Sequence, residues 1–222
     1  MNMDDSAQTQ SLPERLLSTA IDVFGRKGLE GASTRAIAAA AGTTMSMITY
    51  HHGGKEGLYL AAARSIAEQI GERITPAFAA AARIEAADDA AAALAQVVAL
   101  VDEFANVMVR PESAAWARFI VREQMEPTPA FDILYGGVMG RLIDHISALV
   151  VRATGGRLGP TEARLRTIAI VGQALVFRFA RATVLRATGW ASIDAEETAA
   201  IRGVVRAHTT AILADARAGA ET

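Results

Sequence analysis

Short hydroxyl and thioether side chains are concentrated between Thr43 and Thr49. Side chains of this kind can hydrogen-bond to base edges in the major groove of DNA and pack against thymine methyl groups. We assign Thr43, Met45, Ser46 and Thr49 to such contacts, although Ser46 and Thr49 could also be merely solvent-facing. Thr44 can cap a helix and could in addition reach a phosphate. Contacts of this type require a helix that carries these residues on its outer face.

Two short helices joined by a tight turn would position these residues. Ser33 or Thr34 can cap a first helix, and Gly42 can end it because glycine tolerates left-handed backbone geometry. A second helix then runs from about Met45 to His51, with Ile48 turned toward the first helix. This is helix-turn-helix spacing, and the alanines before Gly42 allow the two helices to approach closely.

The pattern IAAAAGTT-x-x-x-I-x-YHH-x-GKEGLY within Ser33 to Tyr59 resembles the DNA-binding signature of TetR-family transcriptional regulators. That signature typically reads IA-x-x-AGVS-x-x-x-x-YYHF-x-SKE-x-L, and Leu12 to Gly28 fits the family's first helix. Three positions depart from it: Thr49 replaces the usual first Tyr, His52 the usual Phe, and Gly54 the usual capping Ser.

The resemblance implies phosphate contacts for Tyr50, His51 and Lys55, and we place Thr34 in the same DNA-binding set. Lys55 has independent support, because the start of a helix offers free N–H groups and a favourable dipole to an anion. The alternatives are a packed aromatic at Tyr50, a plain surface histidine at His51 and a solvated lysine at Lys55.

The sequence gives little support for a metal site, a phosphate-binding loop or a catalytic site. His51 and His52 are adjacent, and neighbouring helical residues project about 100° apart and rarely ligate one ion. Gly53-Gly54-Lys55 lacks the other residues of a phosphate-binding loop. The absence of cysteine excludes disulfides, thiolate metal sites and cysteine nucleophiles. We therefore expect no metal and no cofactor, and no acid–base or nucleophile arrangement points to an enzyme.

Composition gives the net charge of the chain and bears on its expected location in the cell. The net charge of −2 gives no global basic field, so a DNA-binding surface must be local. Between Arg26 and Arg64 basic residues outnumber acidic ones, although this could reflect only the bias of the chain toward arginine. The polar first ten residues do not resemble a signal peptide, and no apolar run approaches about 18 residues. We expect a cytoplasmic protein without a membrane span.

Helical periodicity continues along the whole chain, and no sustained period-two alternation indicates a strand. The expected fold is all-α, with about nine helices. Besides the two helices above, we expect helices over 12–27, from Lys55 to Thr75-Pro76, from about Leu94 to Arg110-Pro111, over 112–125, from Pro129 to Gly155, from Pro160 to Gly189, and from a cap at Ser192 onward. In the Pro160–Gly189 helix we expect Leu165, Ile168, Gly172, Leu175, Val176 and Phe179 to point inward.

A second resemblance lies in RFIVREQMEPTPAF, Arg118 to Phe131, which is similar to the C-terminal domain of CecR-like regulators. Methionine and aromatic residues gather in this part of the chain, as in apolar small-molecule sites between helices. For any single one of them an ordinary core position is the better interpretation, and it is only as a set that they fit a cavity. Arg122 with Glu123 is interpreted first as a buried or partly buried structural ion pair, with a ligand contact as the alternative. The proposed ligand-binding set is Met108, Trp116, Phe119, Arg122, Met125, Phe131, Tyr135 and Met139.

Together these features predict a helix-turn-helix DNA-binding domain over 11–58 and a helical ligand-binding and dimerisation domain over 59–218. By resemblance, the protein would be a homodimeric regulator of a palindromic operator in double-stranded DNA. Its dimer would form through the last two helices, and a small amphipathic or aromatic effector would release it. The alternative is an all-α protein–protein adaptor that has lost DNA binding.

Overall fold

A computed structural model describes residues 11–83 and 90–218. Every regular element in these residues is helical, which confirms the all-α fold class. The expectation for the first ten residues lies outside the described residues. The elements are α1 (Leu12–Gly31), α2 (Thr34–Ala41), α3 (Met45–His52), α4 (Lys55–Arg83), α5 (Ala90–Val109), α6 (Ser113–Met125), α7 (Pro129–Leu134), the π-helical turn η1 (Tyr135–Met139), α8 (Gly140–Ala153), α9 (Pro160–Phe179), α10 (Arg181–Thr188) and α11 (Ala195–Ala218).

Backbone proximity divides the chain into two compact units, each built from two segments of sequence. The N-terminal unit comprises the described part of Met1–Ile70 together with Ala114–Val138. The C-terminal unit comprises the described parts of Gly71–Ser113 and Met139–Thr222. Most of α6 and all of α7 therefore pack with α1–α3 and the first part of α4.

In the N-terminal unit, α1 begins as its sequence predicts. Ser11 and Glu14 form a capping box, and a proline occupies the first turn. The helix is broken at Gly28, whose φ of 71° lies in the left-handed region. Phe24 is fully buried and packs edge-on against Tyr59 of α4, with ring centroids 4.9 Å apart. An ion pair of 2.8 Å between Asp22 and Arg118 also joins α1 to α6.

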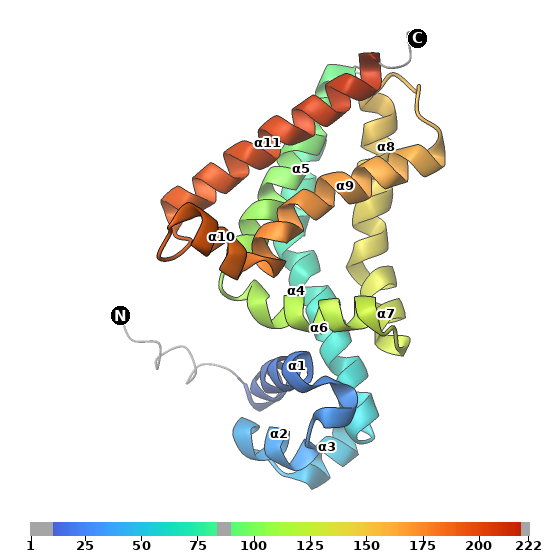
Figure 1. Cartoon of the computed structure of the whole chain (residues 1–222). Coiled ribbons are helices and arrows are strands. Elements are labelled where there is room, and N and C mark those ends of the chain that lie inside the picture. Colours follow the sequence, from blue (N-terminus) through green and yellow to red (C-terminus); the bar gives the residue numbers. More distant parts are fainter. Residues whose placement is uncertain (1–10, 84–89, 219–222) are drawn as a thin grey trace. The chain divides into compact units, whose positions relative to one another are not determined.

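The C-terminal unit is organised around α5, which contacts α8, α9 and α11 (Figure 1). Val97, Val101 and Ile146 are among its fully buried side chains. The buried side chain of Arg178 on α9 donates to the carbonyl oxygens of Met108 and Arg110, both at 2.6 Å. It thereby shares with the Ser113 hydroxyl the carbonyl groups at the end of α5, where helical hydrogen bonding runs out.

Several expected helix limits are wrong. Helix α4 continues through Pro76 to Arg83 instead of ending at the proline. The expected helix from Pro129 to Gly155 is divided by the π-helical turn, and the one from Pro160 to Gly189 is divided at Ala180. These are properties of backbone geometry that hydrophobic periodicity does not report. Helix α11 begins at Ala195, after Asp194, so the expected cap at Ser192 is also wrong.

The outward face of α9 contradicts a further expectation. Leu165 and Ile168, expected to point inward, are 62% and 54% exposed. Val176 and Phe179 of the same stripe are exposed as well. The buried side of α9 instead carries Ala163, Thr167, Ile170, Ala174 and Arg178. An apolar stripe therefore lies on the surface of the chain.

Two helical stretches, Ala90–Val109 and Pro129–Ala153, have the length and composition of a membrane span. The expectation that no apolar run reaches this length is therefore wrong. The sharply bent pair α9 and α10 would pass the same test if counted as one span. In α5 the apolar side chains are largely buried, and the helix packs against α8, α9 and α11. Packing inside the C-terminal unit accounts for its apolar composition.

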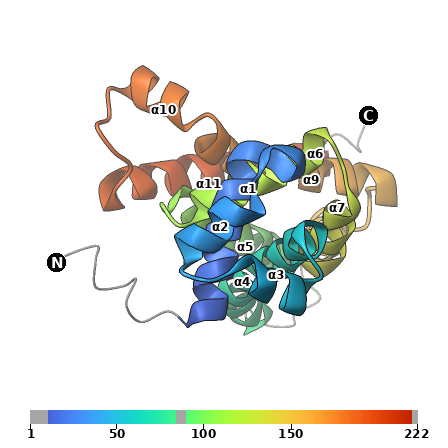
Figure 2. The same ribbon diagram turned by 90° about the horizontal axis from the view of Figure 1, so that it is seen from below.

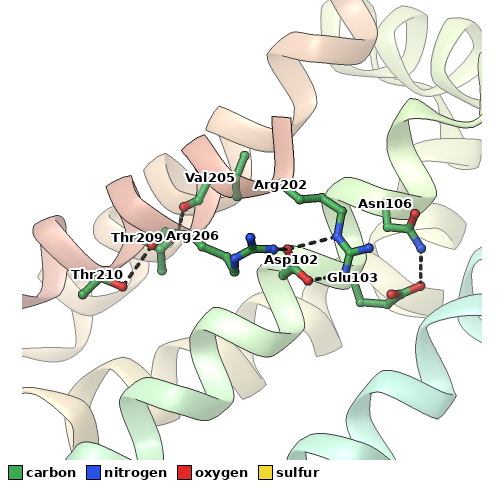
Figure 3. A network of polar contacts seen from close by, with 8 residues as sticks. All are labelled: Asp102, Glu103, Asn106, Arg202, Val205, Arg206, Thr209 and Thr210. Atoms are coloured by element: carbon green, nitrogen blue, oxygen red, sulfur yellow. Dashed lines mark hydrogen bonds and ion pairs between the residues drawn. The ribbon is translucent and has the colours of Figure 1, made fainter. Parts of the chain in front are cut away.

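Figure 3 shows the ionic contact that joins α5 to α11. The Asp102 carboxylate, 13% exposed, accepts hydrogen bonds from both Arg202 and Arg206. Burial opposes ionisation of Asp102, but the hydrogen bonds from the two arginines outweigh it and hold its pKa below the ordinary value. The carboxylate is therefore ionised wherever the protein is folded near neutral pH.

We expect Asp102→Asn to lower the free energy of unfolding by about 1–3 kcal/mol at pH 7, because the three charge-assisted hydrogen bonds from Arg202 and Arg206 are weakened. A lowered native pKa stabilises the fold above the unfolded pKa, about 3.9, and this contribution disappears as the pH falls through the native pKa. The difference between variant and wild type should therefore shrink as the pH falls through the native pKa of Asp102. Calorimetric melting at pH 7 and pH 3 measures it. Asp144→Asn, which removes an exposed ion pair to Arg164, is the matched control and should change stability by less than about 0.5 kcal/mol. Equal melting of the Asp102 variant and wild type at pH 7 would contradict the assignment.

Candidate nucleic-acid interface

The helix-turn-helix forms with the predicted caps. The Ser33 side chain accepts a hydrogen bond from the Ala36 amide at the start of α2, and Gly42 ends this helix with a φ of 68°. The Thr44 side chain accepts from the Met47 amide at 3.3 Å and caps α3. These local expectations are confirmed, because each depends on residues within one turn of the helix end.

The core of this motif is small, as two closely approaching helices require. Ile37, Ala38 and Ala41 of α2 are buried, and Ile48 is the buried residue of α3. A contact that the sequence did not indicate supports them: Arg15 of α1 donates to the Ala41 carbonyl oxygen at 3.0 Å. The other side chains of α3 are exposed, apart from half-buried His52.

Most of the proposed base-contacting residues belong to α3, the helix labelled beside α2 and α4 in Figure 2. Met45, Ser46 and Thr49 are exposed, and Thr43 and Thr34 are half-buried at the adjoining helix ends. Met47 is also exposed and was not included in the predicted set. Its position between Met45 and Thr49 on a helix with one buried residue could have indicated this.

The proposed phosphate-contacting residues cluster at the end of α3 and the start of α4. Tyr50 is 83% exposed, so it is not a packed aromatic, and its ring lies edge-on to that of exposed His51. The Lys55 ammonium donates to the Glu30 carbonyl oxygen at 3.0 Å, which holds it beside the first turn of α4. An ammonium group has three donors, so this hydrogen bond leaves capacity for a phosphate oxygen.

His52 behaves differently from its neighbour. Burial lowers its pKa, and the nearby charges of His51 and Arg64 lower it further. His52 is therefore neutral at physiological pH and adds no positive charge to the surface. It is half-buried, as expected for a residue standing where an aromatic is usual.

The structure separates the proposed ligand-binding residues into groups. Met108 and Met139 belong to the C-terminal unit, and the other six belong to the N-terminal unit. Met125 is 78% exposed, and the exposed ring of Tyr135 stacks on Phe131 with centroids 5.9 Å apart. Trp116 is buried. Among the described residues, these eight side chains are thus distributed over two units and over buried and exposed positions.

Phe119 lies in the core of the N-terminal unit. It is fully buried and stacks on Tyr59, with ring centroids 4.6 Å apart. The expected ion pair between Arg122 and Glu123 is not among those of the described residues. Glu123 instead accepts a hydrogen bond from the Tyr59 hydroxyl at 2.5 Å, while Arg122 donates to the carbonyl oxygen of Arg26. Adjacent residues on a helix point in different directions, which explains the difference.

Comparison with known proteins decides the family. Residues 16–62 match the family model "Bacterial regulatory proteins, tetR family", and residues 90–216 match "HTH-type transcriptional dual regulator CecR, C-terminal domain". The chain is 34% identical over 216 residues to the HTH-type transcriptional dual regulator CecR of Shigella flexneri, covering 95% of this chain and 96% of the relative. The chain belongs to the TetR family of transcriptional regulators. Its C-terminal part is of the CecR type.

Further relatives agree with this TetR-family assignment. Over 56 residues the chain is 45% identical to the HTH-type transcriptional regulatory protein RaaS of Mycobacterium tuberculosis, covering 25% of this chain and 26% of the relative. A TetR-family regulator from Streptomyces coelicolor shares the fold with a TM-score of 0.65 at 18% identity, covering 96% of this chain and 94% of that one. AibR, solved with isovaleryl coenzyme A and operator DNA, has a TM-score of 0.64 at 17% identity, covering 88% and 96%.

The protein is thus a DNA-binding transcriptional regulator of the TetR family with a helix-turn-helix. The family and the relatives are regulators and not enzymes, as the sequence predicted.

Proposed function

We propose that this TetR-family protein is a cytoplasmic, ligand-responsive repressor that binds a palindromic operator as a homodimer. Residues 11–58 would bind DNA, and residues 59–218 would bind the effector and form the dimer. The observation that supports it most directly is the pair of uncovered surfaces on one chain: the polar face of α3 and the apolar stripe of α9.

The apolar stripe of α9, defined as Leu165, Ile168, Val176 and Phe179, supports the dimer. Its members recur at helical spacing and are all exposed in the single chain. Val204 of α11, a helix that contacts α9, is exposed as well. A soluble chain rarely leaves such a stripe open to water. A second copy related by a two-fold axis would cover it with the same residues and form a four-helix interface.

The dimer would place two copies of α3 on one face of the DNA. A two-fold protein implies a palindromic site, with half-sites one or more helical turns apart. Thr43, Met45, Ser46 and Thr49 would read base edges, whereas Tyr50, His51 and Lys55 would hold the backbone. Thr34 and Thr44, at the helix starts, would add backbone contacts through hydroxyl groups.

Release would require an effector that prefers one of two conformations, because a ligand with equal affinity for both shifts nothing. The methionine and aromatic residues proposed above favour a small amphipathic or aromatic compound. AibR, solved with both a small molecule and its operator, gives a precedent for this arrangement on the same fold.

Selection of binding sites from a randomised duplex library, using the purified protein at two salt concentrations, tests the proposal. We expect recovery of a palindrome whose affinity falls steeply with salt, because a dimer neutralises several phosphates. Recovery of no motif, with no salt-dependent affinity for DNA, would contradict it. That outcome would favour an adaptor that keeps the helix-turn-helix without binding DNA.

We expect Lys55→Ala to weaken binding to all DNA sequences alike and to reduce the salt slope by about one unit for each phosphate that the lysine neutralises. Substitution of Ser46 or Thr49 should instead change which duplexes are preferred and leave the salt slope as it is. Titrations of selected and scrambled duplexes over a range of salt separate the two effects. An unchanged slope for Lys55→Ala would mean that this lysine serves only its hydrogen bond with Glu30.

A further inference from the structure

The carboxylate of Glu123 joins three helices of the N-terminal unit, although it is only 1% exposed. One oxygen accepts the Tyr59 hydroxyl of α4 at 2.5 Å. The other accepts the amide of Thr128 at 3.0 Å and its hydroxyl at 2.9 Å, at the start of α7. Glu123 itself lies on α6. We refer to these three residues as the Tyr59–Glu123–Thr128 network.

One end of the network lies close in sequence to α3, the second helix of the helix-turn-helix, which we call the recognition helix. Tyr59 follows closely after Gly53, the left-handed residue that ends α3, and it is buried near the start of α4. Its ring is fixed on two sides, by the stack on Phe119 and the edge contact with Phe24. A displacement of Tyr59 would therefore displace the first turns of α4 and, with them, the end of α3.

The other end of the network fixes the start of α7. The Thr128 hydroxyl accepts the Ala130 amide at 3.2 Å and thereby caps this helix. The same hydroxyl donates to Glu123. The cap and the carboxylate are thus oriented by one side chain, and movement of α7 would change both.

Because the carboxylate of Glu123 is buried, the hydrogen bonds that it accepts from Tyr59 and Thr128 depend on each other. A carboxylate inside a protein is tolerated when it is fully hydrogen-bonded, and loss of a donor leaves a buried charge short of partners. Burial raises the pKa of Tyr59, and its hydrogen bond to Glu123 raises it further, so the phenol remains a donor at physiological pH. Tyr59 and Thr128 are therefore expected to stay with Glu123 together or to leave it together.

A second close approach keeps the same segment against α4. A Cβ atom at Gly137, in the π-helical turn after α7, would lie 2.8 Å from the Cβ of Ala67. Ala67 is about two helical turns beyond Tyr59 on α4. The segment 114–138 therefore contacts α4 at two positions along the helix, through Glu123 at Tyr59 and through Gly137 at Ala67.

We propose that the Tyr59–Glu123–Thr128 network couples the α6–α7 segment to the recognition helix, so that these three residues are positioning residues for operator binding. A change in α7 would reach α3 through the carboxylate without any of the three touching DNA. Of the two tests of this proposal, only the measurement of operator binding rests on the proposed function.

Hydrogen–deuterium exchange of the full chain tests the coupling without DNA. Thr128→Val removes the hydroxyl that caps α7, far in sequence from the recognition helix. We expect faster exchange not only at the start of α7 but also across Met45–His52 and the first turns of α4, whereas Thr128→Ser should restore the wild-type pattern. Thr154→Val, which removes a buried hydroxyl of the C-terminal unit, is the control and should leave α3 unchanged. Faster exchange limited to α7 would overturn the proposal.

Operator binding gives a second, independent test with the duplex selected above. Tyr59→Phe retains the ring contacts and removes only the hydroxyl. We expect Tyr59→Phe and Thr128→Val each to change operator affinity by about 2- to 30-fold with the salt slope unchanged, since every phosphate-contacting side chain is retained. The double variant should resemble a single one, because both act through Glu123. Additive effects, or none, would overturn the coupling. If wild type selects no duplex, the proposed function fails, and the exchange experiment still decides the network.

Discussion

Phe119→Ala should lower the free energy of unfolding by about 3–5 kcal/mol, the usual cost of removing a fully buried aromatic side chain. The residue is 0% exposed and stacks on Tyr59, so its removal would open a cavity between α4 and α6. Since both helices belong to the unit that carries the helix-turn-helix, DNA binding should be lost with the fold. Denaturant titration followed by DNA titration measures both effects.

Met125→Ala is the matched control for Phe119→Ala. It removes a large apolar side chain from the same helix, but this side chain is largely exposed, and we expect a change within about 0.5 kcal/mol. Both residues belong to the proposed ligand-binding set. Comparing the two variants therefore distinguishes a role in the core from a role in ligand binding. A Phe119 variant with wild-type stability and altered effector response would show that this side chain serves the ligand and not the core.

Ile168→Glu should convert the dimer into monomers and weaken operator binding by about 100-fold or more. In the proposed dimer the side chain is buried at the two-fold interface, where an unpaired charge costs about 3 kcal/mol or more. In the single chain the position is exposed, so the fold itself should tolerate glutamate. Sedimentation velocity gives the oligomeric state, and titration of the selected duplex gives the affinity.

Ala148→Glu controls for the added charge, because Ala148 is exposed on α8 of the same unit. This variant should remain dimeric and bind the operator as wild type does. Leu165→Glu, on the same stripe, should reproduce the effect of Ile168→Glu. If both stripe variants stay dimeric with unchanged affinity, the apolar stripe of α9 is not the dimer interface.

The helix-turn-helix was predictable because its signals are local. Ser33, Thr44 and Gly42 act on amides and carbonyls within one turn, and the resemblance to the family rests on the short segment Ser33 to Tyr59. The exposed face of α3 followed from Ile48, its buried residue. Neither conclusion required knowledge of what lies beyond the motif.

The regulatory part of the chain was less predictable. Periodicity indicated that Leu165, Ile168, Val176 and Phe179 share a face of α9, but not whether that face meets the chain's own core or the surface. It also could not distinguish Phe119, which lies in a core, from exposed Met125. Both are large apolar residues of α6, and only the tertiary packing shows that one is buried and the other exposed.

By itself the sequence determined the helical class, the ends of α2 and α3, and most of the residues that are exposed on α3. These depend on backbone propensities and on contacts within a few residues. Only the tertiary structure decided that α6 and α7 pack with the DNA-binding helices, and that Glu123 bonds to Tyr59, 64 residues away, instead of to neighbouring Arg122. The physical reason is that a buried carboxylate takes whichever donors the fold brings to it, and chain separation does not enter that choice.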